Sequence, residues 1–217
     1  MRTTNGQLLA LTLGDTPKAW SDAGFRVGPD DAVTLGSTLV LLSGSGEGFE
    51  GWALDGVDGP LDGLPTTTVP PGAAGDGEPN PNGITRIDHV VVRTGDCSRT
   101  VAAFTEAGFE VRGGRSTTSY GAPMRQTFFW AGNVILELVG PDDGEPTTEE
   151  PTSIFGLALV AEDLDRTAAS LGELLGAPKD AVQPGRRIAG LRHRRVGMSL
   201  PIAVMSPHVR PNGPVEP

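Results

Sequence analysis

The chain has 217 residues, of which 37% are hydrophobic, enough to build the core of one large domain or of two small ones. Its formal net charge of −10 would repel phosphate backbones, so we expect no binding to nucleic acid. The sequence has no apolar run as long as a membrane-spanning helix, no apolar signal-peptide core after Met1, and a single cysteine, so we expect a cytoplasmic protein without a membrane partner.

The first predicted elements, within residues 1–57, form a short strand–helix–strand–strand unit. An apolar, β-rich run occupies residues 8–13, and Asp15 follows it as a candidate N-cap of a helix. The segment GSTLVLLSG, at 36–44, predicts a later strand between two glycines. We expect a degenerate βαββ module here.

Residues 58–83 are rich in Pro, Gly, Asp and Thr and show no hydrophobic periodicity. Such a composition is typical of a loop or linker between folded units. We therefore predict a linker over this range.

A longer version of the same unit is predicted over residues 84–142. Its first strand is the apolar run 87–92, Asp96 is the candidate N-cap of the helix that follows, and Gly108 is the candidate C-cap. Three further strand-like segments complete a βαβββ module: 109–112, 126–130 and 134–139.

The pattern returns over residues 153–207. The segment GLALVAEDLDRTAA, at 156–169, matches HVVVRTGDCSRTVA, at 89–102, and Asp163 aligns with Asp96. Gly176 is the candidate C-cap of this helix, strands are predicted at 187–192 and 201–205, and residues 208–217 form a tail. Internal repetition of this kind predicts an α+β fold made of repeated βαβββ modules.

These repeated units resemble the vicinal oxygen chelate (VOC) superfamily, which includes glyoxalase I, bleomycin-resistance proteins and extradiol dioxygenases. The resemblance is clearest over residues 84–207, where 87–92 looks like the family's first strand and 134–139 like its fourth strand. It implies that two modules form curved mixed sheets around a pocket. It also implies a divalent metal in that pocket, held by a His or Gln from the first strand and a Glu from the fourth strand of each module.

Only one module carries these ligand types. His89 and Glu137 stand at the two positions in the second copy, whereas the third copy has Gly156 and Ala203 there. Because a catalytic divalent site usually has about three protein ligands, the resemblance implies an incomplete metal site at His89 and Glu137.

The same two residues are candidate catalytic groups. Glu137 could act as a general base that His89 orients. The alternative is that both line the pocket and share only a hydrogen bond. A carboxylate within the apolar strand 134–139 is costly to bury without a partner or water, which favours a functional role.

Further polar residues are candidates for substrate binding, because the planar fork of an arginine binds carboxylates and phosphates. Gln126 and four arginines form this set: Arg112, Arg115, Arg125 and Arg187. The alternative is a solvated strand face on which these charges pair with nearby acids.

Three functions fit these features. The first is a glyoxalase-like lyase or isomerase, or a relative of the dioxygenases, that acts through His89 and Glu137. The second is a metal-free protein that sequesters a small molecule between modules, as bleomycin-resistance proteins do. The third is an interaction module in which residues 1–57 fill the cup. The resemblance also implies a homodimer.

Overall fold

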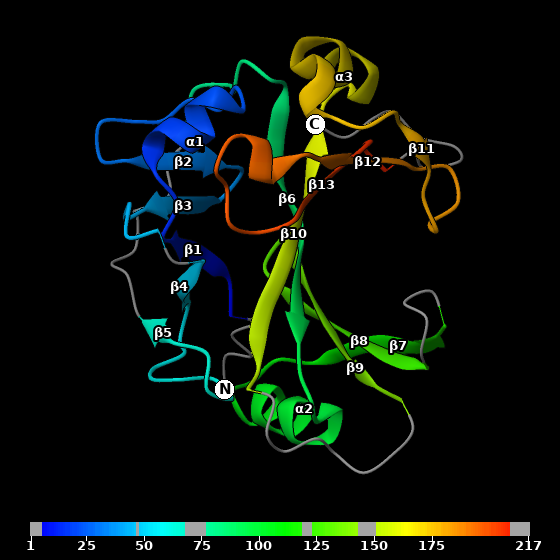
Figure 1. Ribbon diagram of the computed structural model, residues 1–217. Coiled ribbons are helices and arrows are strands. Elements are labelled where there is room, and N and C mark those ends of the chain that lie inside the picture. Colours follow the sequence, from blue (N-terminus) through cyan, green and yellow to red (C-terminus); the bar gives the residue numbers. More distant parts are fainter. Residues whose placement is uncertain (1–5, 47, 68–76, 119–122, 143–150, 209–217) are drawn as a thin grey trace.

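The computed structural model describes residues 6–46, 48–67, 77–118, 123–142 and 151–208. These residues form two curved, mixed sheets, one of five strands and one of eight (Figure 1). The predicted α+β class with repeated modules around a cup is confirmed. No helix in these ranges is both long enough and apolar enough to span a bilayer.

The first module builds most of the five-stranded sheet, whose order is β2-β3-β1-β4-β5. Its elements are β1 (Leu8–Leu13), α1 (Pro17–Asp22), β2 (Ala32–Leu35) and β3 (Thr38–Leu42). Thr16, and not the predicted Asp15, caps α1, with its hydroxyl accepting from the Ala19 amide at 3.2 Å. The Asp15 carboxylate instead accepts from Trp20 Nε1 at 2.9 Å and from the Ser199 amide at 2.8 Å.

The range predicted to be a linker, 58–83, contributes to this sheet. Within it, β5 (Thr66–Thr67) pairs in parallel with β4 (Phe49–Leu54), which pairs with β1 in antiparallel fashion. Because β4 lies before residue 58, the first module has the order βαβββ and not the predicted βαββ. Leu61 and Leu64, between these two strands, are buried in the core. A two-residue strand and two isolated leucines give no periodic pattern, so the Pro- and Gly-rich composition of this range predicted only a linker.

The second module has the predicted βαβββ order. Its elements are β6 (Ile84–Arg93), α2 (Cys97–Glu106), β7 (Val111–Thr117), β8 (Met124–Ala131) and β9 (Val134–Pro141). Asp96 caps α2 by accepting from the Arg99 amide at 2.9 Å. Gly108 ends the helix with φ of 95°, a conformation that favours glycine.

The third module repeats that order. Its elements are β10 (Ser153–Ala161), α3 (Leu164–Leu171), a 3₁₀ turn (Gly172–Leu174), β11 (Lys179–Asp180), β12 (Arg187–Leu191), a second 3₁₀ turn (His193–Arg195) and β13 (Ile202–Met205). Asp163 caps α3 as predicted. The helix ends at Gly172, with φ of 53°, four residues before the predicted Gly176.

The second and third modules share the eight-stranded sheet, with order β11-β12-β13-β10-β6-β9-β8-β7. Their first strands, β6 and β10, pair in antiparallel fashion at the centre. Both ends of the sheet bend toward the right in Figure 1, so its concave face opens to that side, and the five-stranded sheet lies on the opposite side.

The core lies between the two sheets. Trp52 of β4 meets Phe104 of α2 with ring centroids 6.1 Å apart, and Phe104 meets Phe129 of β8 at 5.2 Å. The described residues of the first module therefore pack on the convex side of the large sheet. They do not fill the cup, which removes the third of the expected functions.

Candidate functional site

A β-bulge in β6 directs two neighbouring polar side chains to the concave face. Ala158 of β10 pairs with His89 and Leu159 pairs with Ile87, so Asp88 has no partner on β10. An extra residue of this kind interrupts the alternation of side chains and re-aims them. As a result His89 Nδ1 lies 2.9 Å from Asp88 Oδ2.

His89 and Glu137 meet on this face. His89 Nε2 lies 3.4 Å from Glu137 Oε2, and the two side chains are 16% and 11% exposed. The two residues come from adjacent parallel strands, in which Val91 is the register partner of Glu137. Their convergence agrees with the sequence-based expectation, and their catalytic role stays a prediction.

Asp88 is held from its other side by a buried arginine. Arg186, 1% exposed and just before β12, donates to Asp88 Oδ1 from Nη2 at 2.8 Å and to Oδ2 from Nη1 at 3.2 Å. Arg186 also donates to Gln183 Oε1 at 2.7 Å and to the Ser206 carbonyl at 3.0 Å. Burial raises the pKa of Asp88, but the hydrogen bonds from His89 and Arg186 and the charge of Arg186 outweigh it and hold that pKa well below its ordinary range.

Glu137 is held on its second oxygen by Gln126. Gln126 Nε2 donates to Glu137 Oε1, and Gln126 Oε1 accepts from Arg115 Nε at 2.5 Å. Gln126 is 2% exposed, so its amide positions the carboxylate from within the wall of the cup. A continuous polar chain thus crosses the concave face: Arg186, Asp88, His89, Glu137, Gln126 and Arg115.

A cavity of about 340 Å³ lies beside this chain. Its lining is mainly apolar: Val91, Arg93, Met124, Val139 and Phe155. Val91 is the cross-strand neighbour of Glu137, and Val139 lies two residues farther along the same strand and so on the same face. Glu137 and His89 are not themselves part of this lining, but Glu137 neighbours Val91 and Val139, so its carboxylate lies next to the apolar pocket.

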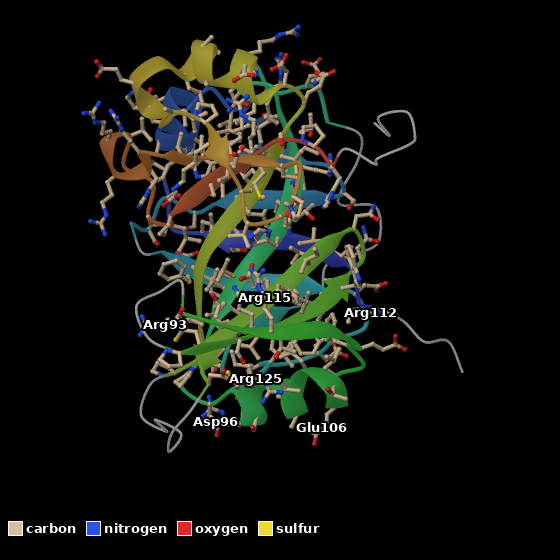
Figure 2. The ribbon with its side chains drawn as sticks, turned by 90° about the vertical axis from the view of Figure 1, so that its right-hand side faces the viewer. Arg93, Asp96, Glu106, Arg112, Arg115 and Arg125 are labelled. Atoms are coloured by element: carbon tan, nitrogen blue, oxygen red, sulfur yellow. The ribbon has the colours of Figure 1, made fainter. Side chains whose placement is uncertain are left out.

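Three of the predicted substrate-binding residues lie away from this cavity. Arg125 is exposed and adjacent to Gln126 on β8, so it points to the opposite face, where its charge opposes the burial that raises the pKa of the Cys97 thiol. Arg112 pairs with Glu110 at 3.0 Å, and Arg187 pairs with Asp165 of α3 at 2.7 Å. Figure 2 shows Arg112 at the margin of this face, apart from Arg115.

The pairing of Asp88 with Arg186 is the part of the polar chain that the sequence did not reveal. They are 98 residues apart, and alternation along a regular strand would place Asp88 on the face opposite His89. The available signal was a single carboxylate next to His89 in an apolar strand.

The donor set does not fit the divalent metal that the family resemblance implies. The described residues include no group of three His, Cys, Asp or Glu side chains able to hold a metal ion. Register confirms the equivalent positions, because Ala158 pairs with Ala203 as Val91 pairs with Glu137. At Gly156, the other position, a Cβ would lie 2.6 Å from the Pro201 carbonyl oxygen, so no side chain fits there.

Two solved structures share this architecture over nearly the whole chain. A triple mutant of 4-hydroxymandelate synthase from Streptomyces coelicolor is 13% identical, with 93% of this chain and 92% of that chain covered and a TM-score of 0.62. A fusion of a xylose isomerase-like TIM barrel and 4-hydroxyphenylpyruvate dioxygenase is 11% identical, with 95% of this chain and 49% of the fusion protein covered and a TM-score of 0.63. The chain has the vicinal oxygen chelate fold.

The VOC fold thus extends over both sheets of this protein. At these identities the likeness concerns the fold alone. The sequence matches no protein-family model, and a search of curated proteins also gives no match. The function must therefore be argued from the cup.

Proposed function

We propose that this protein binds a small molecule in the cup and that Glu137 and His89 transfer a proton on that molecule. The observation that carries the proposal is the carboxylate–imidazole pair, 3.4 Å apart, on the concave face next to an apolar cavity lined by its neighbours Val91 and Val139. A mostly apolar pocket with a few convergent polar groups is the usual form of a small-molecule site. This role would place the protein among glyoxalase-like lyases and isomerases.

The polar chain supports a defined direction of proton transfer. An ionised Asp88 can only accept hydrogen bonds, so His89 Nδ1 carries the proton between them. His89 Nε2 is then an acceptor that faces Glu137 Oε2, so a proton that Oε2 receives can be donated to Nε2 in a hydrogen bond. Glu137 would take a proton from the ligand, with His89 stabilising the protonated state, and would return the proton in the second step.

Binding in the cup is tested by a ligand-observed NMR screen of small molecules against the full chain. Val139→Trp fills the cavity, so we expect it to abolish binding of the compounds found. Val182→Trp is the matched control, because Val182 is 72% exposed and outside the cavity lining. Binding that survives Val139→Trp would contradict the proposed location.

A second candidate is a metal-free protein that sequesters its ligand, of the bleomycin-resistance type. It is favoured by the partners of Glu137, since both carboxylate oxygens already have a polar neighbour and the remaining lining is largely apolar. The two candidates differ in proton exchange. If the protein is an enzyme, we expect the bound ligand to gain deuterium in D₂O and Glu137→Gln to abolish this gain. Glu110→Gln is the control and should leave the gain unchanged, because Glu110 forms an exposed ion pair. For a sequestering protein, no deuterium enters the ligand.

A further inference from the structure

We infer that the ligand of the cup is an organic anion with an apolar body, and that Arg115 binds its negatively charged group. This inference rests on the proposed binding in the cup and names the chemical class of the ligand. It selects Arg115 from the arginines of β7 and β8 that the sequence offered as candidates for substrate binding.

Arg115 and the cavity lie in one row across the large sheet. Arg115 of β7 is the register partner of Gln126, Gln126 is the partner of Val139, and Val139 is the partner of Arg93. Cross-strand partners project from the same face of a sheet. Arg115 therefore stands at the other end of this row from the cavity wall of Val139 and Arg93, and with Gln126 it lines a neighbouring hollow of about 480 Å³. Figure 2 shows Arg93 and Arg115 on the side that faces the viewer.

The Arg115 guanidinium is fixed in place but only partly used. Its Nε donates to Gln126 Oε1 at 2.5 Å, and its central carbon lies 6.0 Å from the centre of the Phe128 ring. Among the described residues it forms no ion pair with a carboxylate, whereas Arg112, three residues earlier on the same strand, pairs with Glu110. The two terminal nitrogens of Arg115 therefore remain as donors, in the fork geometry that binds a carboxylate or phosphate group.

The charges of the concave face leave room for an anion at this end. Asp88 is neutralised by Arg186, at the other end of the polar chain. Gln126 separates Arg115 from Glu137, since its amide accepts from the first and donates to the second. An anionic group on Arg115 would thus stay clear of the Glu137 carboxylate, while a neighbouring carbon of the same ligand comes within reach of it.

In a chain of net charge −10, a cationic group near the cavity favours the approach of an anion. The apolar part of the ligand would then lie over Val139 and Met124. Carboxylates and phosphate monoesters share the chemistry that Arg115 recognises, and the test has to separate them.

The test compares matched anionic and neutral probes by calorimetry with the full chain: phenylacetate with phenylacetamide, hexanoate with hexanamide, and phenyl phosphate with phenol. We expect an anion of at least one pair to bind at least about 10-fold more tightly than its neutral partner, and its affinity to fall as salt is added. The better of the carboxylate and phosphate arms identifies the source of the negative charge.

Arg115→Gln should weaken binding of that anion by about 10- to 100-fold, the usual range for a charge-assisted hydrogen-bonded pair. Arg112→Gln is the matched control and should leave the affinity unchanged. Both residues are exposed on the edge strand β7, so neither variant should alter the far-UV circular dichroism spectrum.

Three results overturn the inference in distinguishable ways. If neutral probes bind as tightly as anions while Val139→Trp still abolishes binding, the cup is a binding site but not one for anions. If anions are preferred but Arg115→Gln binds them normally, Arg115 does not hold the negative charge. If neither the anionic nor the neutral probes bind, the proposed function fails together with the inference.

Discussion

At the scale of single residues, the pair of Arg186 and Asp88 decides how the candidate site is held. Both side chains are almost fully buried, and they join the loop before β12 to the bulge of β6. Removing one partner of a buried pair leaves an uncompensated charge, which is far more costly than losing an exposed pair.

We therefore expect Arg186→Met to lower the free energy of unfolding by about 3–5 kcal/mol, measured by urea denaturation. The adjacent Arg187→Met is the matched control, because its partner Asp165 is 70% exposed. That control should change the free energy of unfolding by less than about 1 kcal/mol. Equal effects of the two substitutions would show that Asp88 does not depend on Arg186.

The depressed pKa of Asp88 makes a prediction for acid stability. The pKa of Asp88 in the folded state is lower than its unfolded value of about 3.9. Such a carboxyl group stabilises the fold fully at pH values above about 3.9, and this stabilisation is lost as the pH falls below that value. The urea midpoint of the wild type should therefore fall between pH 5 and pH 2.5. In Asp88→Asn this fall should be shallower, and an unchanged pH dependence would contradict the assignment.

The sequence predicted the centre of the site but not its supports. His89 and Glu137 could be placed because each occupies a recognisable position in a repeated strand pattern. The pairing of Asp88 with Arg186 and the contact of Arg115 with Gln126 could not be predicted, because they depend on a bulge and on pairing between segments that are distant in the chain. Two of the arginines chosen from sequence, Arg112 and Arg125, lie on an edge or on the opposite face.

At the scale of elements, strand β10 explains why the third module has no metal ligand. Gly156 stands where His89 stands in the second module, and a Cβ there would meet the backbone of Pro201 at 2.6 Å. The pairing of β10 with β13 is therefore too close for any side chain at this position. The third module therefore offers no side chain to the cup at the position that His89 occupies in the second.

Gly156→Ala should consequently lower the free energy of unfolding by about 1–3 kcal/mol, because the backbone of β13 has to move. Gly190→Ala, on β12, is the control, since a Cβ there meets nothing within 4 Å. Its effect should stay within about 0.5 kcal/mol of the wild type. Chemical denaturation of both variants checks this, and a neutral Gly156→Ala would show that β10 and β13 can separate at no cost.

Most elements of the second and third modules were predictable, because each has an apolar strand, an aspartate N-cap and a helix in the same order. The elements that escaped prediction are those with weak local signals. β5 has only two residues. The end of α3 was predicted at Gly176 rather than Gly172 because the 3₁₀ turn that follows the helix continues the helical pattern of the sequence.

At the scale of the whole molecule, the two sheets share one hydrophobic core. Phe104 of α2 lies at its centre and contacts aromatic rings from both halves, Trp52 on one side and Phe129 on the other. Since the five-stranded sheet covers the convex face, we expect the halves to unfold together. The expected homodimer stays a prediction.

Phe104→Ala should lower the free energy of unfolding of the entire chain by about 3–5 kcal/mol. In a Trp130→Phe background the remaining tryptophans, Trp20 and Trp52, report on the five-stranded half, while far-UV circular dichroism reports on all strands. The two probes should give the same urea midpoint before and after the Phe104 substitution. Separate midpoints would show that the halves are independent units.

The claim on which this account depends is that a ligand enters the concave face of the large sheet. The most direct measurement is a methyl NMR titration of the full chain with the tightest-binding compound of the screen. We predict shifts at Val91, Met124 and Val139, with no shift at Leu9 or Leu39 of the five-stranded sheet. Shifts confined to the five-stranded sheet, with the methyl groups of the cavity unperturbed, would contradict it.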